Sequence, residues 1–463
     1  MLNRKRVAFF NREKIRSELT TLNYVEARRL NGPIYCALVK ELYEEGCRIS
    51  ARHLENLAEK ETFFYETKVI RDRVCDNRDL LMALFENMRV AEKVQIVEQA
   101  ERYQTTVKCL YQIIQLLEPY KIAFDWLLAH IYSIIIPICE HIESINEPNT
   151  KETIARIYFK TAKFHSLREN SLPIAIKFME KAMELSRNEA WLSEYVTERE
   201  WGVYPTLHLV AGREVACFFL KYAKNVSSLD SKAAEEAAQK AAISLAEVGI
   251  EKNKLEYIRA LISRAKYMLN SENYESSSKL LLRVQKDLAK HTTVTEPKIF
   301  CDLYLYEGIC LWNQNDINSA IAKLKEALKF AIKSLSQRRE AEVCVAIGKI
   351  YASKMDTESQ RTAFNAFMRA KQIFGKLGDA LNRKKAHYML AKLKADKIFP
   401  SLMDLLKNSQ EKACGFYNLR QWKNGCKAFW NTMGVEELKK DKIYCLLEDK
   451  IEDTFAWEDN EFV

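Results

Sequence analysis

The stretch Asp302–Ala331, which reads DLYLYEGICLWNQNDINSAIAKLKEALKFA, decides the fold of this chain. Gly308 is followed twelve residues later by Ala320, and then by Leu324 and Ala327. Two antiparallel helices can approach closely only where the facing side chains are small, so this spacing predicts a helix hairpin that crosses at Gly308 and Ala320. Leu324 and Ala327 are then expected to pack against the next helix pair.

The same pattern recurs upstream and downstream. Gly348 takes the place of Gly308 in the next copy, and the second helix then carries Ala363, Phe367 and Ala370, with three additional residues expected in the turn within Lys354–Arg361. Upstream, the first-helix position is filled by Ala265 and by Ala162. The second-helix residues of these two copies are Ser277, Leu281 and Val284, and Ala175, Met179 and Ala182.

The crossing positions Ala162, Ala265, Gly308 and Gly348 are separated by 103, 43 and 40 residues. The first interval holds two units, of which the second is divergent, with helices expected around Arg213–Ala223 and at Lys232–Val248. Four copies in register predict an all-α fold, a tetratricopeptide-repeat α-solenoid in which helix hairpins form a right-handed superhelix.

The composition agrees with this fold. The chain has 463 residues, is 48% apolar, and contains only 12 Gly and 8 Pro. Few helix breakers favour an all-helical chain, and a solenoid of this length needs no division into globular domains. We expect five segments: a basic N-terminal arm at 1–29, a helical region at 30–145, the repeats at 146–398, a C-terminal capping helix with an aromatic segment at 399–447, and an acidic tail at 448–463.

Sites of chemistry are not evident in the sequence. It contains no phosphate-binding loop, no dinucleotide-binding glycine motif and no H-E-x-x-H motif, and its seven histidines are scattered. We therefore expect no enzyme activity, no cofactor and no metal site. The twelve cysteines form no C-x-x-C pair and no secretory signal is apparent, so we expect reduced thiols in the cytoplasm.

The most apolar stretch, Ile122–Cys139, is interrupted by Asp125, His130 and Pro137. A membrane span needs about 20 nearly uninterrupted apolar residues, so we expect a buried helix pair here and no membrane span.

First helices of the repeats line the concave groove of such a solenoid, which makes their groove-facing positions candidates for peptide binding. These positions are Arg156, Lys163, Arg259, Lys266, Asn270, Leu305, Trp312, Asn313 and Lys349. One interpretation is a basic channel that holds an extended, acidic peptide, with Trp312 as anchor and the two asparagines bonding the peptide backbone. The alternative is that these charges lie on ordinary solvated helix faces.

The net charge of +9 permits several partners. Nucleic acid is not favoured, because no aromatic–basic stacking motif is present, and no small-molecule substrate is expected. The tail Glu448–Val463 has seven acids, one base and the aromatic residues Phe455, Trp457 and Phe462. It either folds back onto the basic groove or stays solvated.

The segment Ala386–Lys392, which reads AHYMLAK, is similar to the last helix of the axonemal tetratricopeptide-repeat protein 29 family. The matching residues are His387, Tyr388, Ala391 and Lys392. A second match, to the family's short L-x-x-W-K segment, consists of Leu419, Trp422 and Lys423. The resemblance covers Ile154–Lys423 and does not extend to the sequence after Trp430.

The resemblance implies a non-catalytic interaction scaffold of the motile cilium or sperm flagellum axoneme, which supports dynein-arm assembly or docking and flagellar motility. Its partners would be axonemal or dynein-arm proteins, and its location the cytoplasm, cytoskeleton and axoneme. The alternative is a general cytosolic repeat adaptor, associated with chaperones or signalling.

Overall fold

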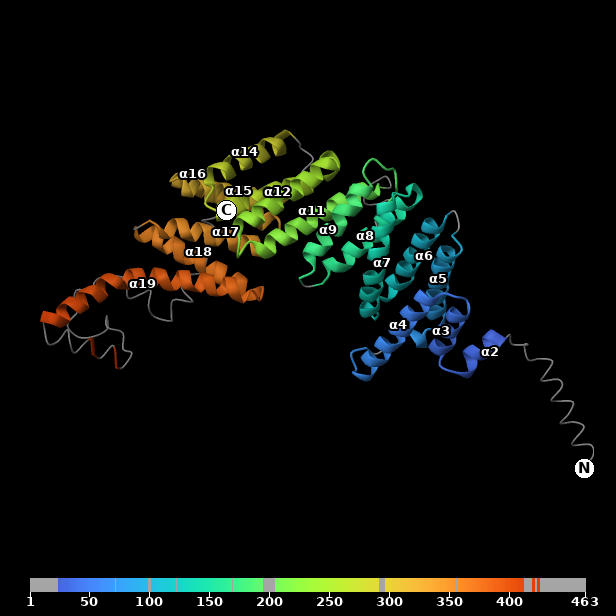
Figure 1. Cartoon of the computed structure of the whole chain (residues 1–463). Coiled ribbons are helices and arrows are strands. Elements are labelled where there is room, and N and C mark those ends of the chain that lie inside the picture. Colours follow the sequence, from blue (N-terminus) through green and yellow to red (C-terminus); the bar gives the residue numbers. More distant parts are fainter. Residues whose placement is uncertain are drawn as a thin grey trace, which may run out of the picture. The chain divides into compact units, whose positions relative to one another are not determined.

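The computed structural model describes residues 24–70, 72–98, 101–121, 123–168, 170–194, 205–290, 296–354, 356–411, 419–420 and 423–424. In these ranges the regular elements are α-helices and short 3-10 turns, and one isolated antiparallel bridge pairs Leu192 with Thr206 (Figure 1). This confirms the all-α class. The chain divides into two compact units, 1–218 and 219–463, which are described separately below.

The first unit contains helices that pack mainly with their neighbours in sequence. Hairpins are formed by α3 with α4, α5 with α6, and α8 with α9. Its helices are α2 (Tyr24–Asn31), α3 (Ile34–Glu44), α4 (Arg48–Glu66), α5 (Arg78–Ile96), α6 (Arg102–Leu117), α7 (Asp125–Ile145), α8 (Lys151–Ser166), α9 (Leu172–Leu185) and the first part of α11 (Leu207–Val226).

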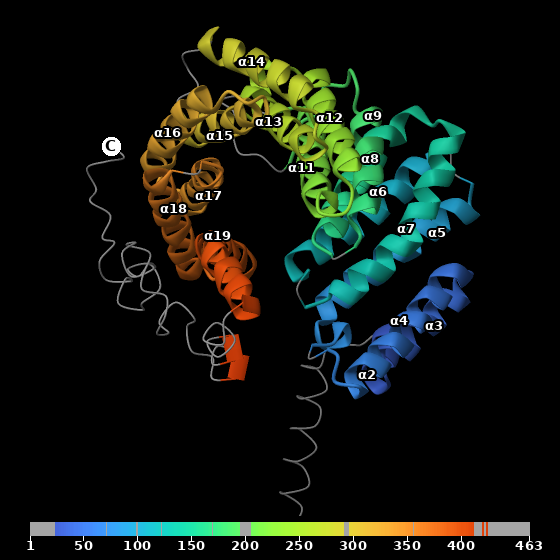
Figure 2. The ribbon, with the colours of Figure 1, turned by 90° about the vertical axis from the view of Figure 1, so that its left-hand side faces the viewer.

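The second unit continues with helix hairpins in strict succession, and α15 packs on α16 and α17 on α18. In Figure 2, α15 and α17 lie on the inner side of the curve of this unit, and α14, α16 and α18 on its outer side. After α11 its helices are α12 (Ser231–Glu247), α13 (Lys254–Asn270), α14 (Tyr274–Lys290), α15 (Pro297–Asn313), α16 (Ile317–Lys333), α17 (Gln337–Ala352), α18 (Thr357–Lys376) and α19 (Ala380–Glu411).

The helix crossings confirm the predicted register. A Cβ atom placed on Gly308 would lie 2.8 Å from Cγ of Leu324 and 3.2 Å from the backbone oxygen of Ala320. A Cβ atom on Gly348 would lie 2.6 Å from a ring carbon of Phe367. Each glycine is therefore needed because the second helix of its own hairpin leaves no room for a side chain. The hairpins are those of a tetratricopeptide-repeat type solenoid.

The three additional residues of the last repeat lie in a helix and not in the turn, which corrects the prediction. The second helix starts nine residues after the crossing glycine in both hairpins, at Ile317 and at Thr357. Helix α18 has 20 residues and α16 has 17, so the insertion lengthens α18 at its start. A turn that keeps its length preserves the hairpin geometry, and an extra helical segment is accommodated at the surface.

The expected boundary at 398/399 is wrong. Helix α19 runs without a break from Ala380 to Glu411 and contains Pro400. Proline lacks the N–H that would bond the carbonyl of Asp396, but both residues are exposed, so water can satisfy that carbonyl. The start of the segment expected at 399–447, with its C-terminal capping helix, is therefore the second half of α19.

The expected basic arm ends earlier than predicted. Arg28 and Arg29 belong to α2 and form ion pairs with Glu44 and Glu41, at 2.9 and 2.6 Å. Residues 1–23, Trp422 and the acidic tail Glu448–Val463 lie outside the described residues. The handedness of the superhelix stays a prediction.

The apolar stretch near residue 130 forms the single helix α7 and not the expected helix pair. By length and composition, α7 is the one helix in the described ranges that could cross a membrane, and 33% of its apolar window is buried. It ends at Asn146, whose left-handed conformation (φ 57°) closes the helix. Helix α7 therefore carries more apolar surface than its neighbours cover.

Candidate functional site

The two candidate groove cations of the first unit are already paired within the chain. Arg156 contacts carboxylate oxygens of Glu152 at 2.6 Å and Glu194 at 3.2 Å, and it donates to the backbone oxygen of Leu192. Lys163 lies 2.6 Å from Glu214. A ligand carboxylate would have to displace these partners, so neither residue offers an open positive site.

The other seven candidates belong to the second unit. Arg259 donates two hydrogen bonds to Glu296, at 2.6 and 2.7 Å. Lys266 and Lys349 are exposed, and neither forms an ion pair with a described residue. Asn270 is exposed at the end of α13, and Asn313 uses its amide to donate to the backbone oxygen of Ile309 at 2.9 Å.

Leu305 is a wrong assignment to the groove. Its side chain is 4% exposed and belongs to the core cluster that α15 forms with α16 and α17. Trp312 is half-buried and packs against the same cluster. The predicted basic channel is therefore reduced to Lys266 and Lys349, because its arginines are paired and its apolar members pack inward.

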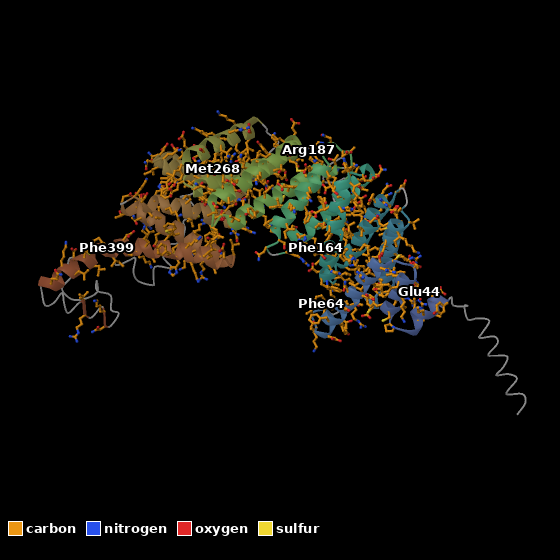
Figure 3. All side chains as sticks on the ribbon, in the orientation of Figure 1. Glu44, Phe64, Phe164, Arg187, Met268 and Phe399 are labelled. Atoms are coloured by element: carbon orange, nitrogen blue, oxygen red, sulfur yellow. The ribbon has the colours of Figure 1, made fainter. Side chains whose placement is uncertain are left out.

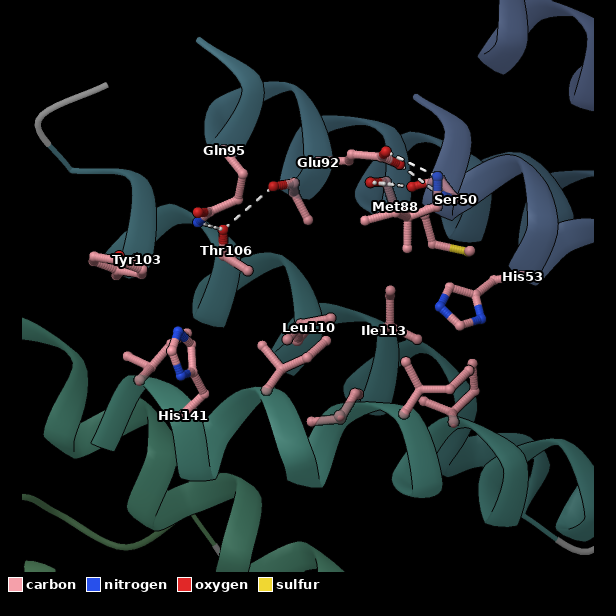
Figure 4. A pocket seen from close by; sticks show the side chains of 17 residues that line it. Ser50, His53, Met88, Glu92, Gln95, Tyr103, Thr106, Leu110, Ile113 and His141 are labelled. Atoms are coloured by element: carbon pink, nitrogen blue, oxygen red, sulfur yellow. Dashed lines mark hydrogen bonds between the residues drawn. The ribbon is translucent and has the colours of Figure 1, made fainter. Parts of the chain in front are cut away.

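A pocket of about 320 Å³ lies elsewhere, in the first unit, where α4, α5, α6 and α7 converge (Figure 4). Its lining is dominated by aliphatic side chains, and α7 contributes a stripe of isoleucines at helical spacing. These are Ile131, Ile134, Ile135, Ile138 and Ile142. Ile134 and Ile138 are half-buried and Ile49 is exposed, so the mouth of the pocket is also apolar.

Four polar side chains of the pocket wall, those of Ser50, Glu92, Gln95 and Thr106, are bonded to other groups of the wall. The carboxylate of Glu92 accepts hydrogen bonds from the backbone N–H groups of Ile49 and Ser50, at 2.9 and 2.6 Å. These N–H groups belong to the first turn of α4 and have no partner in their own helix. Glu92, from α5, thus caps the N-terminus of α4, and both of its carboxylate oxygens accept hydrogen bonds there.

A second polar pair lies near the other end of the wall. Gln95 donates from Nε2 to Oγ1 of Thr106 at 2.7 Å, and Thr106 donates to the backbone oxygen of Ala91 at 3.3 Å. Ser50 similarly donates to the backbone oxygen of Met88 at 3.1 Å. Because these groups are already bonded, the space inside presents mainly carbon.

Histidines stand at both ends of the pocket, His53 at one and His141 at the other (Figure 4). Burial lowers the pKa of His53, and the nearby charge of Glu92 opposes this shift only in part. His53 is therefore neutral at physiological pH, and the interior suits an uncharged, apolar group. A pocket lined mainly by aliphatic side chains suits apolar groups.

The pocket was missed at the sequence level. Its walls come from four helices spread over residues 49–142, and no local motif records their convergence. The one available signal is the apolar stretch Ile122–Cys139, which by itself predicts only a buried helix pair. Across the described ranges, no group of three His, Cys, Asp or Glu side chains could hold a metal ion.

No family model matches the sequence, and no curated protein matches it. Three solved structures are similar at low identity. A signal transduction ATPase with numerous domains and a tetratricopeptide repeat sensor, from Pyrococcus horikoshii, is 14% identical, with a TM-score of 0.35. The match covers 80% of this chain and 54%, about half, of that protein.

The other two are Rap proteins. RapI in its apo form is 15% identical over 80% of this chain and 99% of that chain, with a TM-score of 0.37. A Rap protein complexed with competence and sporulation factor is 14% identical over 88% of this chain and 97% of that chain, with a TM-score of 0.35. The repeat fold rests on the helix crossings described above.

Proposed function

We propose that this chain is a non-catalytic protein-interaction scaffold that anchors apolar side chains of a partner protein in the pocket between α4, α5, α6 and α7. The observation that carries the proposal is the apolar pocket itself, where Ser50, Glu92, Gln95 and Thr106 are already hydrogen-bonded within the wall. Buried aliphatic or aromatic anchors supply most of the free energy of many protein interfaces.

A partner polypeptide fits the pocket better than a free metabolite does. A small ligand is usually enclosed over 70–90% of its surface. Here Ile49 is exposed at the rim, and Ile134 and Ile138 are half-buried at the mouth. An apolar rim that stays at the surface suits side chains attached to a backbone that lies across it, such as an amphipathic helix.

We further propose that the protein is located in the axoneme of the motile cilium or sperm flagellum, where it supports dynein-arm assembly or docking. This proposal rests on the resemblance of Ala386–Lys392 to the axonemal repeat family. Tyr388 and Lys392 of this segment are exposed on α19, where a partner can reach them. The corresponding location is the cytoplasm and cytoskeleton.

The test compares two substitutions on α7 in cells that build motile cilia. Ile134 and Ile136 are both half-buried, but only Ile134 lines the pocket. Tagged wild-type protein and Ile136→Asp should stay with detergent-extracted axonemes, and Ile134→Asp should be released. Melting curves of the purified variants control for folding, since both substitutions put a charge on a partly buried site.

Two results would count against the proposal, and they are distinguishable. Retention of Ile134→Asp at the wild-type level would show that the pocket is not the anchor. Complete extraction of the wild type, with normal ciliary beating in its absence, would leave a general cytosolic adaptor as the better description.

A further inference from the structure

Helix α19 carries an exposed seam of alternating apolar and basic side chains. The residues follow one another at steps of four and three, which places them on one face of the helix. The seam consists of Leu381, Lys385, Tyr388, Lys392, Ala395 and Phe399. Leu381 is 64%, Tyr388 66% and Phe399 59% exposed, and Figure 3 labels Phe399 on this helix.

The opposite face of α19 is occupied. Ala386, Leu390 and Leu393 are buried, and α19 makes its extensive contacts with α18. The solvent-facing side of a helix in a repeat protein is normally polar. The outward face of α19 instead carries large exposed apolar side chains, which indicates that another polypeptide segment packs against it.

The charge of this face indicates what covers it. Helix α19 carries seven Lys or Arg residues and three Asp or Glu residues in its sequence. Lys385 and Lys392 form no ion pair with any residue in the described ranges, and neither do their neighbours Arg383 and Lys384. A covering segment should therefore be acidic and carry apolar side chains between its acids.

The C-terminal sequence of the chain has this composition. The tail Glu448–Val463 has seven acids and one base, with Phe455 and Trp457 between the charges. The 36 residues 412–447 separate Glu411, where α19 ends, from Glu448, where the tail begins. Such a connection reaches up to about 120 Å when extended, and the seam is only about 27 Å long at 1.5 Å per helical residue.

We propose that the tail Glu448–Val463 docks on the seam of α19. Its carboxylates face Lys385 and Lys392, and Phe455 or Trp457 packs beside Tyr388. The predicted groove positions of the second unit are a poorer site for the tail, because Arg259 is already paired with Glu296, and Leu305 and Trp312 pack against the core.

Covalent attachment makes weak docking effective. Exposed ion pairs contribute little individually and are screened by salt. Attachment to the same chain raises the local concentration of the tail to about the millimolar range, so a modest affinity suffices. The docked tail keeps the apolar residues of α19 from other surfaces, and an acidic partner segment could displace it. This docking is independent of the pocket in the first unit.

The experiment uses the full chain with the photo-cross-linking residue p-benzoylphenylalanine in place of Trp457. After illumination at low salt, mass spectrometry should find the link within the peptides of residues 380–411, in a product of monomer mass. The yield should not change on dilution and should fall as salt is added.

Two charge-reversal pairs locate the docking site. Lys385→Glu with Lys392→Glu should lower the yield on the order of tenfold, whereas Lys266→Glu with Lys349→Glu, on the inner helices, should leave it unchanged. Adding Glu458→Lys and Asp459→Lys to the first pair should restore the link. All four lysines are exposed, so the variants should fold.

Three outcomes would overturn the proposal. Links to α13, α15 or α17 that are lost with the Lys266 and Lys349 pair would place the tail in the concave groove. Links that join two chains and grow with concentration would assign the seam to a second copy. Absence of any link at low salt would leave the tail solvated.

Discussion

The crossing of α17 and α18 can be tested by a single methyl group. In Gly348→Ala the new Cβ would lie 2.6, 2.8 and 2.9 Å from three ring carbons of Phe367. Ordinary carbon contacts are about 3.5–4.0 Å, and Phe367 is fully buried, so the ring or the helix must shift. Overpacking of this kind costs about 1–3 kcal/mol.

Part of this cost is offset by helix propensity. Alanine is favoured over glycine inside a helix by about 1 kcal/mol, so the expected net loss for Gly348→Ala is up to about 2 kcal/mol. The matched control is Gly375→Ala in α18, where the new Cβ meets only side-chain atoms of Arg383 at 3.8 Å. This substitution should stabilise the protein by about 0.5–1 kcal/mol.

The assay is urea unfolding followed by far-ultraviolet circular dichroism, with the midpoint compared at a constant slope. Phe367→Leu provides a double-mutant cycle with Gly348→Ala, because the smaller side chain makes room for the methyl group. The loss in free energy of unfolding should be smaller in the double variant than the sum of the losses in the two single variants. Equal stability of Gly348→Ala and Gly375→Ala, or strict additivity in the cycle, would refute the assigned crossing.

Two further predictions concern charge. Burial lowers the pKa of three histidines, namely His53, His130 and His165. Below the ordinary histidine pKa near 6.5, the unfolded chain binds more protons than the folded chain. The stability that these neutral histidines contribute is therefore fully present above pH 6.5, and it is lost as the pH falls from there through the lower pKa of the folded chain. The free energy of unfolding should therefore be lower at about pH 5.5 than at about pH 7.5, and His165→Phe should reduce the difference; an unchanged difference would contradict the assignment of His165. Asp302 accepts two hydrogen bonds of 2.6 Å from Arg339, which join α15 to α17. Asp302→Ala should cost about 1–3 kcal/mol in urea unfolding, whereas Arg338→Ala, at a more exposed pair, should cost less than about 0.5 kcal/mol; equal losses would contradict this ranking.

The sequence predicted the repeats because their determinants are local. Gly308, Ala320 and Leu324 lie within one hairpin, and the structure brings them together as the spacing requires. The insertion was placed in the turn because sequence spacing counts residues without showing whether a helix absorbs them. The boundary at 398/399 was misplaced because the exposed setting of Pro400, which lets α19 continue through it, is not visible in the sequence.

The candidate site was less predictable because its determinants are distant in sequence. Of the two carboxylates that pair with Arg156, Glu152 is local, but Glu194 lies 38 residues away. Leu305 has the spacing of a groove residue but faces the core, because the neighbouring helices of the solenoid surround it. The pocket forms only when four helices pack together, and no local sequence pattern predicts how those helices are placed.

The central claim is that the pocket of the first unit holds a partner polypeptide. The most direct measurement places p-benzoylphenylalanine at Ile49, which is exposed at the rim, or at Ile145, which is exposed on α7 outside the pocket. In ciliated cells, position 49 should give one discrete adduct with another axonemal protein, which is lost on adding Ile134→Asp, and position 145 should give none. The claim would be contradicted by equal adducts at both positions, or by an adduct at position 49 that persists with Ile134→Asp, or by the absence of any polypeptide adduct.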